Sequence, residues 1–186
     1  VIQLIQNANQ YLERIAIKNN GQAHSYEDLL AISKNIALHL LKGKKDLLEA
    51  RIAFLVPSGF EYVCLQWGIW QAGGIAVPLC VKHPLSSLQY VIEDTQAEIV
   101  IYSSEFMELL QPLINKGKTR FLTPFKFIMK RRGDLPDISP SRRAMILYTS
   151  GTTGNPKGVL YSHRSTILHA WASISKEALD IGNSSN

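Results

Sequence analysis

The chain has 186 residues, of which 46% are hydrophobic and 19% are charged. That composition is enough to bury a core and excludes an intrinsically disordered chain, and the length allows one domain or slightly more than one. The net charge of +5 would suit a nucleic-acid partner. The basic residues flank a proline-containing loop, however, as the charges of a solvated linker do, and we expect no nucleic-acid binding. They are Lys126, Lys130, Arg131, Arg132, Arg142 and Arg143.

Cysteine usage argues against a zinc-binding protein, and the longest uncharged stretch does not predict a membrane protein. Cys64 and Cys80 form no Cys-x-x-Cys pair, so we expect buried thiols in a reducing compartment and no zinc site. The stretch from Tyr62 to Val81 carries no charge and is long enough for a membrane span. A Gly-Gly pair and a proline inside it predict helix, turn and strand instead. No secretory signal is visible, and we expect a cytoplasmic protein without a transmembrane span.

The first predicted elements are a hairpin and a helix. Residues 12–26 alternate loosely and break at an Asn-Asn-Gly turn at 19–21. Ser25 then opens a helix, with Asp28 as an imperfect capping-box partner, and apolar residues follow helical spacing up to the next glycine. We expect no chemical role for His39 within this helix.

Strands and helices then alternate along the chain. The run Ile52–Val56 is apolar throughout, as in a strand buried on both faces. Ser58 and Glu61 predict a capping box for the next helix, whose tryptophans belong to the core, and Pro112 should interrupt or tilt a later helix. This alternation predicts an α/β fold, with right-handed βαβ units forming a parallel sheet flanked by helices. The remaining strands are expected at 75–79, 98–102 and 120–122, and the remaining helices at 84–94 and 104–116.

The pattern divides the chain into three segments. Residues 1–122 are expected to form an N-terminal α/β subdomain, and residues 123–141 a proline-containing basic linker. Residues 142–186 should begin a second subdomain, with two strands around a polar loop and then a helix from about His163 to Leu179. The chain starts at Val1 rather than at a methionine and ends in polar residues, and we expect it to be part of a larger protein.

The polar loop at 148–158 carries the most chemical information. It reads Tyr-Thr-Ser-Gly-Thr-Thr-Gly-Asn-Pro-Lys-Gly and follows an apolar strand. Glycines let backbone N–H groups approach phosphate oxygens, hydroxyls add further donors, and a lysine brings a mobile positive charge to the outer phosphates. A solvated Ser/Thr/Gly loop would explain the composition but not this order of elements. The loop is therefore predicted to bind a polyphosphate.

Two other nucleotide-binding motifs do not fit this spacing. A Walker P-loop requires Gly, four residues, and then Gly-Lys-Ser/Thr. Counting from Gly151 places Pro156 where the second Gly belongs, and Gly158 follows Lys157 where a hydroxyl residue is needed. The chain also lacks a Gly-x-Gly-x-x-Gly fingerprint. A P-loop NTPase is thus the least favoured interpretation.

Residues 149–158, Thr-Ser-Gly-Thr-Thr-Gly-x-Pro-Lys-Gly, resemble the signature loop of the adenylate-forming superfamily. That superfamily contains the acyl-CoA synthetases, the nonribosomal peptide adenylation domains and the beetle luciferases. The resemblance runs from about Ala23 to about Ser165, and residues 83–84 and 90–94 resemble the malonyl- and methylmalonyl-CoA synthetases in particular. Upstream segments that resemble the N-terminal region of the superfamily are 56–62 and 71–79.

The resemblance implies a two-step ligase reaction, associated with fatty acid metabolism. A small carboxylic acid attacks the α-phosphorus of ATP and expels pyrophosphate, and coenzyme A then accepts the acyl group from the acyl-adenylate. Lys157 would be the catalytic residue that stabilises the departing pyrophosphate, with Mg²⁺ assisting. The residues implied to hold the β- and γ-phosphates, by hydroxyl, backbone and ammonium donors, are Thr149, Ser150, Gly151, Thr152, Thr153, Gly154 and Lys157.

The same resemblance implies that other parts of the enzyme lie outside this chain. They are the adenine, ribose, acyl and magnesium sites, the rest of the large domain and a C-terminal domain, so we expect the chain alone to be inactive. Two alternatives stay open, a carrier-protein-dependent adenylation domain and a non-catalytic nucleotide-binding or interaction module. For His163, a turn or helix-cap role is favoured over that of a general base. The narrower resemblance points to a small dicarboxylate such as malonate as the acid.

Overall fold

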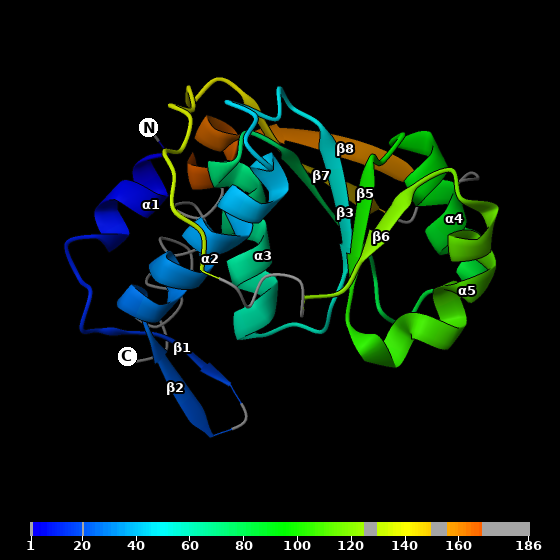
Figure 1. The fold of residues 1–186 in the computed structure, drawn as a ribbon, viewed down its shortest axis with the longest axis horizontal. Helices are drawn as coiled ribbons and strands as arrows, with labels where there is room; N and C mark the ends of the chain where they lie inside the picture. The colour runs from blue at the N-terminus through cyan, green and yellow to red at the C-terminus, as the bar shows by residue number, and fades with distance from the viewer. Residues whose placement is uncertain (1, 20, 125–129, 150–155, 169–186) are drawn as a thin grey trace, which may run out of the picture.

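The computed structural model describes residues 2–19, 21–124, 130–149 and 156–168. At its centre lies a six-stranded sheet (Figure 1), which consists of β3 (Arg51–Leu55), β4 (Ile75–Pro78), β5 (Ile99–Tyr102), β6 (Arg120–Leu122), β7 (Arg143–Thr149) and β8 (Lys157–Ser162). The strand order is β6-β5-β3-β4-β7-β8. Neighbouring strands are parallel, except that β7 and β8 are antiparallel. The predicted α/β fold is confirmed, with one antiparallel strand at the edge of the sheet.

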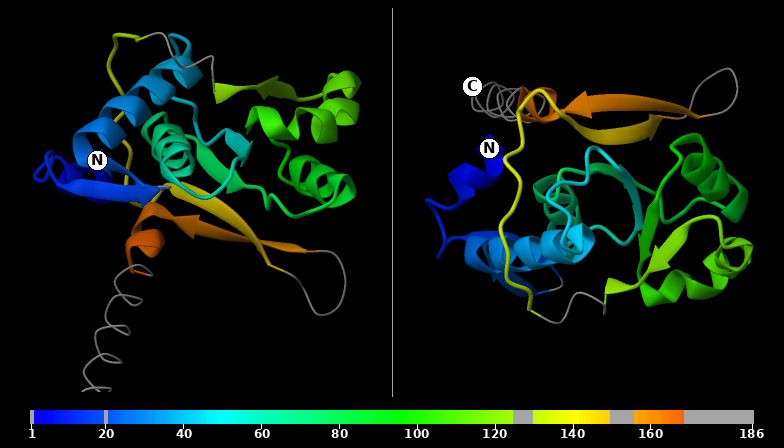
Figure 2. Two further views of the ribbon diagram at one scale, coloured as in Figure 1. Left: turned by 90° about the horizontal axis from the view of Figure 1, so that it is seen from below. Right: turned by 45° about the horizontal axis from the view of Figure 1, so that its top comes forward.

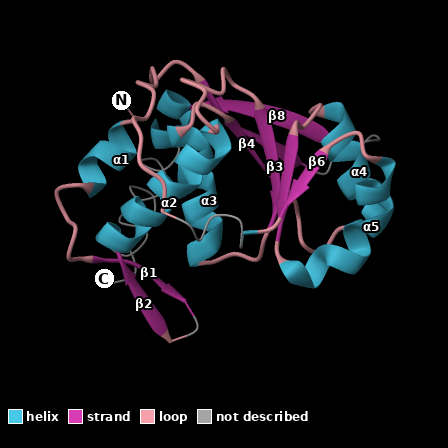
Figure 3. Ribbon diagram, viewed as in Figure 1, coloured by secondary structure: helices cyan, strands magenta, loops and turns pink. Residues whose placement is uncertain are grey.

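Two pairs of helices cover the two faces of this sheet (Figures 1 and 3). One face carries α2 (Tyr26–Leu41) and α3 (Phe60–Gln71), and the other carries α4 (Leu85–Asp94) and α5 (Met107–Lys116), which follows the short 3₁₀ turn η1 (Ser104–Phe106). In this α/β arrangement the central strands β3 and β5, which are covered on both faces, are apolar on both. The continuous apolar runs in the sequence have that origin.

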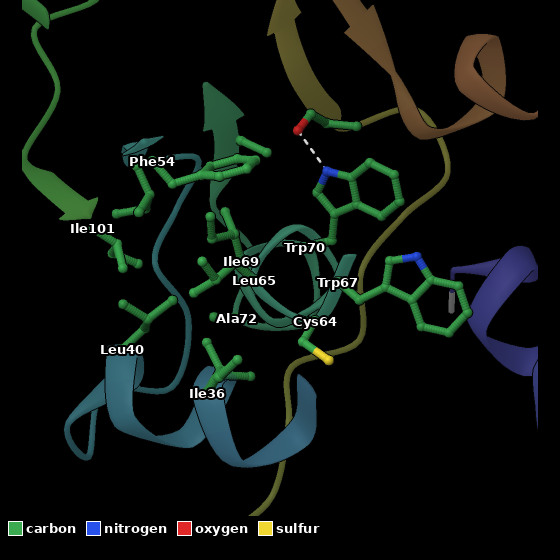
Figure 4. Packing of buried hydrophobic residues seen from close by; sticks show 14 of the residues in the cluster. Ile36, Leu40, Phe54, Cys64, Leu65, Trp67, Ile69, Trp70, Ala72 and Ile101 are labelled. Carbon is green, nitrogen blue, oxygen red and sulfur yellow. Dashed lines mark hydrogen bonds between the residues drawn. The ribbon is translucent and has the colours of Figure 1, made fainter. Parts of the chain in front are cut away.

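Successive side chains of β3 are buried in two different hydrophobic clusters, one on each face of the sheet. Ile52 and Phe54 are buried in the cluster with α2 and α3, whereas Ala53 and Leu55 are buried in the cluster with α4 and α5. Successive side chains of a strand point to opposite faces, so the two clusters share this strand without sharing side chains. Trp70 of α3, 2% exposed, is the largest fully buried side chain of the first cluster, and the prediction that the tryptophans belong to the core is confirmed for the described ones (Figure 4).

The two predicted helix caps have opposite outcomes. At α2 the imperfect box is complete: Ser25 Oγ accepts from the Asp28 amide at 3.1 Å, and Asp28 Oδ2 accepts from the Ser25 amide at 3.0 Å. The capping box predicted at α3 is wrong. The N-cap there is Gly59 at φ 156°, so Glu61 falls one position short of the place that a capping box requires. A Cβ on Gly59 would lie 2.4 Å from the side-chain nitrogen of Asn19, which explains the glycine.

The remaining elements agree with the sequence except at helix ends and at one short helix that was not predicted. The hairpin of β1 (Ile15–Asn19) and β2 (Gln22–Ser25) is antiparallel as predicted, and a short helix α1 (Gln3–Ala8) precedes it. Pro112 lies inside α5 without ending it. The start predicted for α4 is one residue early, because Pro84 is its N-cap. Among the described helices, none is long and apolar enough to cross a bilayer.

The segment predicted as a solvated linker packs against the body of the protein. It crosses the face formed by α2 and α3 (Figure 2), where Ile138 is 2% exposed and the Arg131 amide donates to the Asn35 side chain at 2.9 Å. The prediction of a purely solvated segment is therefore wrong for this part. The prediction of two buried thiols is also wrong, because Cys64 is buried but Cys80 is exposed in the turn after β4.

Candidate phosphate-binding site

The predicted polyphosphate loop connects the two antiparallel strands β7 and β8. β7 runs parallel to β4 and leaves the sheet at the edge where the parallel strands have their carboxyl ends. In open α/β sheets, ligands bind outside this edge. Thr149 at the end of β7 and Lys157 at the start of β8 are paired with each other, and this end of the hairpin therefore lies where this type of fold places its ligands.

Thr149 and Lys157 occupy the two ends of the loop. Thr149 is the last residue of β7, Lys157 is the first of β8, and the two are directly opposite each other in the hairpin. Opposite residues of an antiparallel pair have their side chains on the same face, with Cβ atoms about 4.5–5.5 Å apart. Both residues are exposed. A hydroxyl donor and an ammonium group thus stand side by side on one face of the hairpin.

The other predicted phosphate ligands lie outside the described residues. They are Ser150, Gly151, Thr152, Thr153 and Gly154. Among the described residues, no group of three or more His, Cys, Asp or Glu side chains is arranged to hold a metal ion. The donor set of Thr149 and Lys157 fits a polyanion, and the described part of the site provides no ligand set for Mg²⁺.

Two arginines fix the base of this hairpin to the chain that precedes β3. The Arg142 guanidinium donates to both carboxylate oxygens of Asp46, at 2.5 and 3.1 Å, and to the Gly73 carbonyl at 2.7 Å. Arg143 donates its amide and its Nε to Glu49, at 2.8 and 2.7 Å. Burial acts to raise the pKa of Asp46, but the hydrogen bonds from Arg142 and from the Leu48 amide together lower it. Two members of the predicted basic cluster are therefore structural.

Trp70 and His163 complete the base of the hairpin. The Trp70 indole N–H donates to the Ala144 carbonyl of β7 at 2.7 Å (Figure 4). His163 follows β8, its ring lies edge-on to Trp70 at 5.5 Å, and its side chain is 3% exposed. Burial, and then the positive charge of Arg142, lower the pKa of His163 to about 4. A buried imidazole of this kind is no general base for a substrate, and the predicted structural role fits the geometry.

The helix after β8 begins with a reciprocal pair of serines. The Ser165 amide donates to Ser162 Oγ at 3.1 Å, and the Ser162 amide donates to Ser165 Oγ at 2.8 Å. Residues 163–168 are helical, and the rest of the helix predicted to end near Leu179 lies outside the described residues. The direction of the chain after the hairpin is thus set by a cap that begins at the last residue of β8.

The outer end of β7 is held by Tyr148, for which the sequence predicted no role. The Tyr148 hydroxyl, one residue before Thr149, donates to the Asp94 carboxylate at the end of α4. The Tyr148 ring is also edge-on to the Tyr90 ring of α4, with centroids 6.3 Å apart. Burial, and then the hydrogen bond and charge of Asp94, raise the pKa of Tyr148 above its ordinary value.

A separate apolar cavity of about 630 Å³ lies away from the hairpin. It is bounded by α2, the start of α3 and the linker, with Ile32, Cys64 and Arg131 among its lining residues. Burial, followed by the nearby carboxylates of Glu61 and Asp28, raises the pKa of the Cys64 thiol to about 12. The described residues that line this cavity include none of β7 or β8, so it is separate from the predicted phosphate loop.

Nearly the whole chain is similar in sequence to a known enzyme family. The family model of the AMP-binding enzymes matches residues 4–183. The chain belongs to the AMP-binding enzyme family. The predicted membership of the adenylate-forming superfamily is therefore confirmed, and the matched range includes the β7–β8 hairpin.

Individual relatives agree with the narrower resemblance. The mitochondrial malonate–CoA ligase ACSF3 of Homo sapiens is 36% identical over 86% of this chain, and the malonate–CoA ligase of Arabidopsis thaliana is 29% identical over 85% of it. The chain spans 31% and 30% of the length of these two proteins. The solved fatty acyl CoA synthetase of Mycobacterium tuberculosis superposes on 92% of the chain, and the chain covers 36% of that structure. The TM-score is 0.77 at 21% sequence identity, which shows a common fold.

Proposed function

We propose that this AMP-binding chain is the N-terminal part of an ATP-dependent acid–thiol ligase. The enzyme would activate a small carboxylic acid as its acyl-adenylate and transfer the acyl group to coenzyme A. The observation that carries the proposal is the β7–β8 hairpin, which presents Thr149 and Lys157 on one face at the carboxyl edge of the sheet. The identity to malonate–CoA ligases supports the reaction class.

In the first step a carboxylate oxygen of the acid attacks the α-phosphorus of ATP. The bond from that phosphorus to the bridging oxygen breaks, and the electron pair leaves with pyrophosphate. The Lys157 ammonium stabilises the negative charge that develops on the leaving group, and the Thr149 hydroxyl donates to the outer phosphates. Residues 150–154 contribute further hydroxyl and backbone donors. Bound Mg²⁺ would supply additional neutralisation of the phosphates.

Malonate is the acid that the comparisons favour, and coenzyme A is the acceptor. Both assignments rest on the names of the relatives rather than on a described pocket. The acid, adenine and coenzyme sites belong to the parts of the ligase that this chain does not span, and residues 1–122, 123–141 and 142–186 would be the first subdomain, the linker and the start of the second. A cytoplasmic location stays a prediction, since the human relative is named as mitochondrial.

Replacement of Lys157 tests the proposed chemistry. In the full-length protein, Lys157→Ala should slow acid-dependent ATP–pyrophosphate exchange by about 10²–10³-fold, the usual effect of losing one donor to a developing negative charge. Lys118→Ala, which removes an exposed lysine between α5 and β6, is the matched control. An equal exchange rate in Lys157→Ala and in the control would remove Lys157 from the mechanism.

A further inference from the structure

The outer half of the β7–β8 hairpin is weakly connected to the sheet. In the described part of the chain, β4 and β7 are in register at one Cα pair, Ala76 and Met145. From Ile146 to Thr149, the described partner of β7 is β8, and β8 itself is at the edge of the sheet. Backbone pairing alone would therefore leave the strand ends that carry Thr149 and Lys157 free to swing as a two-stranded unit.

Side chains of the outer half connect it to α4 instead. Ile146 and Tyr148 both pack against the core between the sheet and α4–α5. The Tyr148 hydroxyl also donates to Asp94. The planes of the Tyr148 and Tyr90 rings are 88° apart. The hydroxyl adds direction to an otherwise apolar contact, because a hydrogen bond specifies where the phenol oxygen lies.

Gly158 leaves room for this position of the ring. It lies opposite Tyr148 on β8, and a Cβ there would be 3.2 Å from Tyr148 Cζ and 3.0 Å from Ile146 Cγ2. The ring of Tyr148 thus lies over the backbone of the residue that follows Lys157. Through one side chain, α4 is in contact with both strands next to the loop.

We propose that Tyr148 and Asp94 are positioning residues that hold the two ends of the phosphate loop in the orientation that binds the outer phosphates of ATP. Side chains alternate along β7, so fixing Tyr148 against α4 directs Thr149, and with it the paired Lys157, to the opposite face. Neither Tyr148 nor Asp94 needs to contact the nucleotide. The inference rests on the proposed function, because it assumes that the loop binds the β- and γ-phosphates.

A positioning role predicts a loss of affinity that depends on the outer phosphates. In the full-length protein without acid, Tyr148→Phe and Asp94→Ala should each weaken ATP binding by about three- to tenfold, the equivalent of one hydrogen bond, and leave AMP binding unchanged. The double variant should be no weaker than either single variant, since both remove the same bond. Asp94→Asn, which keeps an acceptor oxygen, should restore part of the affinity.

Two matched controls separate this bond from general effects. Glu93→Gln removes the neighbouring carboxylate of α4, which accepts from Gln89 at 2.8 Å, and Tyr11→Phe removes the hydroxyl of an exposed tyrosine near α1. Both should bind ATP as the wild type does. Tyr148→Phe keeps the ring against Tyr90, and urea unfolding of each variant checks that it is folded.

The possible results distinguish a failure of the positioning role from a failure of the proposed ligase function. A selective loss of ATP affinity with unchanged AMP affinity supports the positioning role. Equal losses for ATP and AMP, or additive effects in the double variant, overturn it, because the pair would then act on the fold as a whole. Wild-type affinity for ATP in both single variants overturns the inference and leaves the proposed function standing. Failure of the wild-type protein to bind ATP overturns both.

Discussion

Protonation of His163 should destabilise the base of the β7–β8 hairpin. The imidazole is 3% exposed and lies edge-on to Trp70. Burial is the main reason that its pKa is lowered to about 4, and the positive charge of Arg142 adds to the effect, while Glu49 opposes it. A proton on this ring would therefore be a second positive charge next to Arg142 in a buried position.

The magnitude follows from the two pKa values. The pKa of the imidazole is 6.5 in the unfolded chain and about 4 in the folded protein. The unfolded chain therefore binds the proton first, and the stability from neutral His163 is complete above pH 6.5 and is lost as the pH falls toward 4. At about 1.4 kcal/mol for each tenfold change in proton affinity, the loss reaches about 3 kcal/mol below pH 4 and about 2 kcal/mol at pH 5.

Urea unfolding at pH 8 and at pH 5, followed by tryptophan fluorescence, measures this loss. The comparison is between the wild-type chain and His163→Phe, which keeps an aromatic ring against Trp70 but removes the proton site. The pH-dependent change in unfolding free energy should be about 2 kcal/mol larger in the wild type. Asp46 and Glu49 contribute equally to both proteins, and their lowered pKa values keep them ionised at pH 5. The same pH dependence in both proteins would show that His163 is not buried as a neutral base.

Two further predictions concern the base of the same hairpin and the outer end of its strands. Arg142→Ala should lower the unfolding free energy by about 2 kcal/mol, because it leaves Asp46 and the Gly73 carbonyl without their donors. Arg143→Ala, which removes a side chain that is 55% exposed, should cost less than about 1 kcal/mol, and equal losses in urea unfolding would contradict this ranking. Gly158→Ala should displace the Tyr148 ring, cost about 1–3 kcal/mol and weaken ATP binding; unchanged ATP affinity in a binding titration would show that the ring is not constrained.

The alternation of strands and helices could be predicted because its cause is local. Residues 52–55 of β3 and all four residues of β5 are apolar because both faces of each strand are buried, and such a run is visible in a short window of sequence. The two strands around the polar loop were also predictable from their apolar residues, but their antiparallel pairing was not predicted. The cap of α3 was not, because the contact of Gly59 with Asn19 depends on how the β1–β2 hairpin packs.

The contacts that hold the candidate site could not be predicted from the sequence, because they join distant residues. Arg142 and Asp46 are 96 residues apart in the chain, and Tyr148 and Asp94 are 54 apart. The composition of 123–141 predicts a linker, but nothing local indicates that Ile138 is buried or that Arg142 has a partner. The loop sequence identifies the chemistry of the site, and the fold supplies the anchors of its two strands.

We propose that the β7–β8 hairpin binds the outer phosphates of ATP in a ligase that activates a carboxylic acid. The decisive assay is ATP–pyrophosphate exchange by the full-length protein, with a panel of mono- and dicarboxylic acids and a no-acid control. Exchange should depend on the acid and be fastest with malonate. If folded protein binds ATP but supports no exchange with any acid, the proposed ligase reaction is wrong and a non-catalytic nucleotide-binding module is favoured.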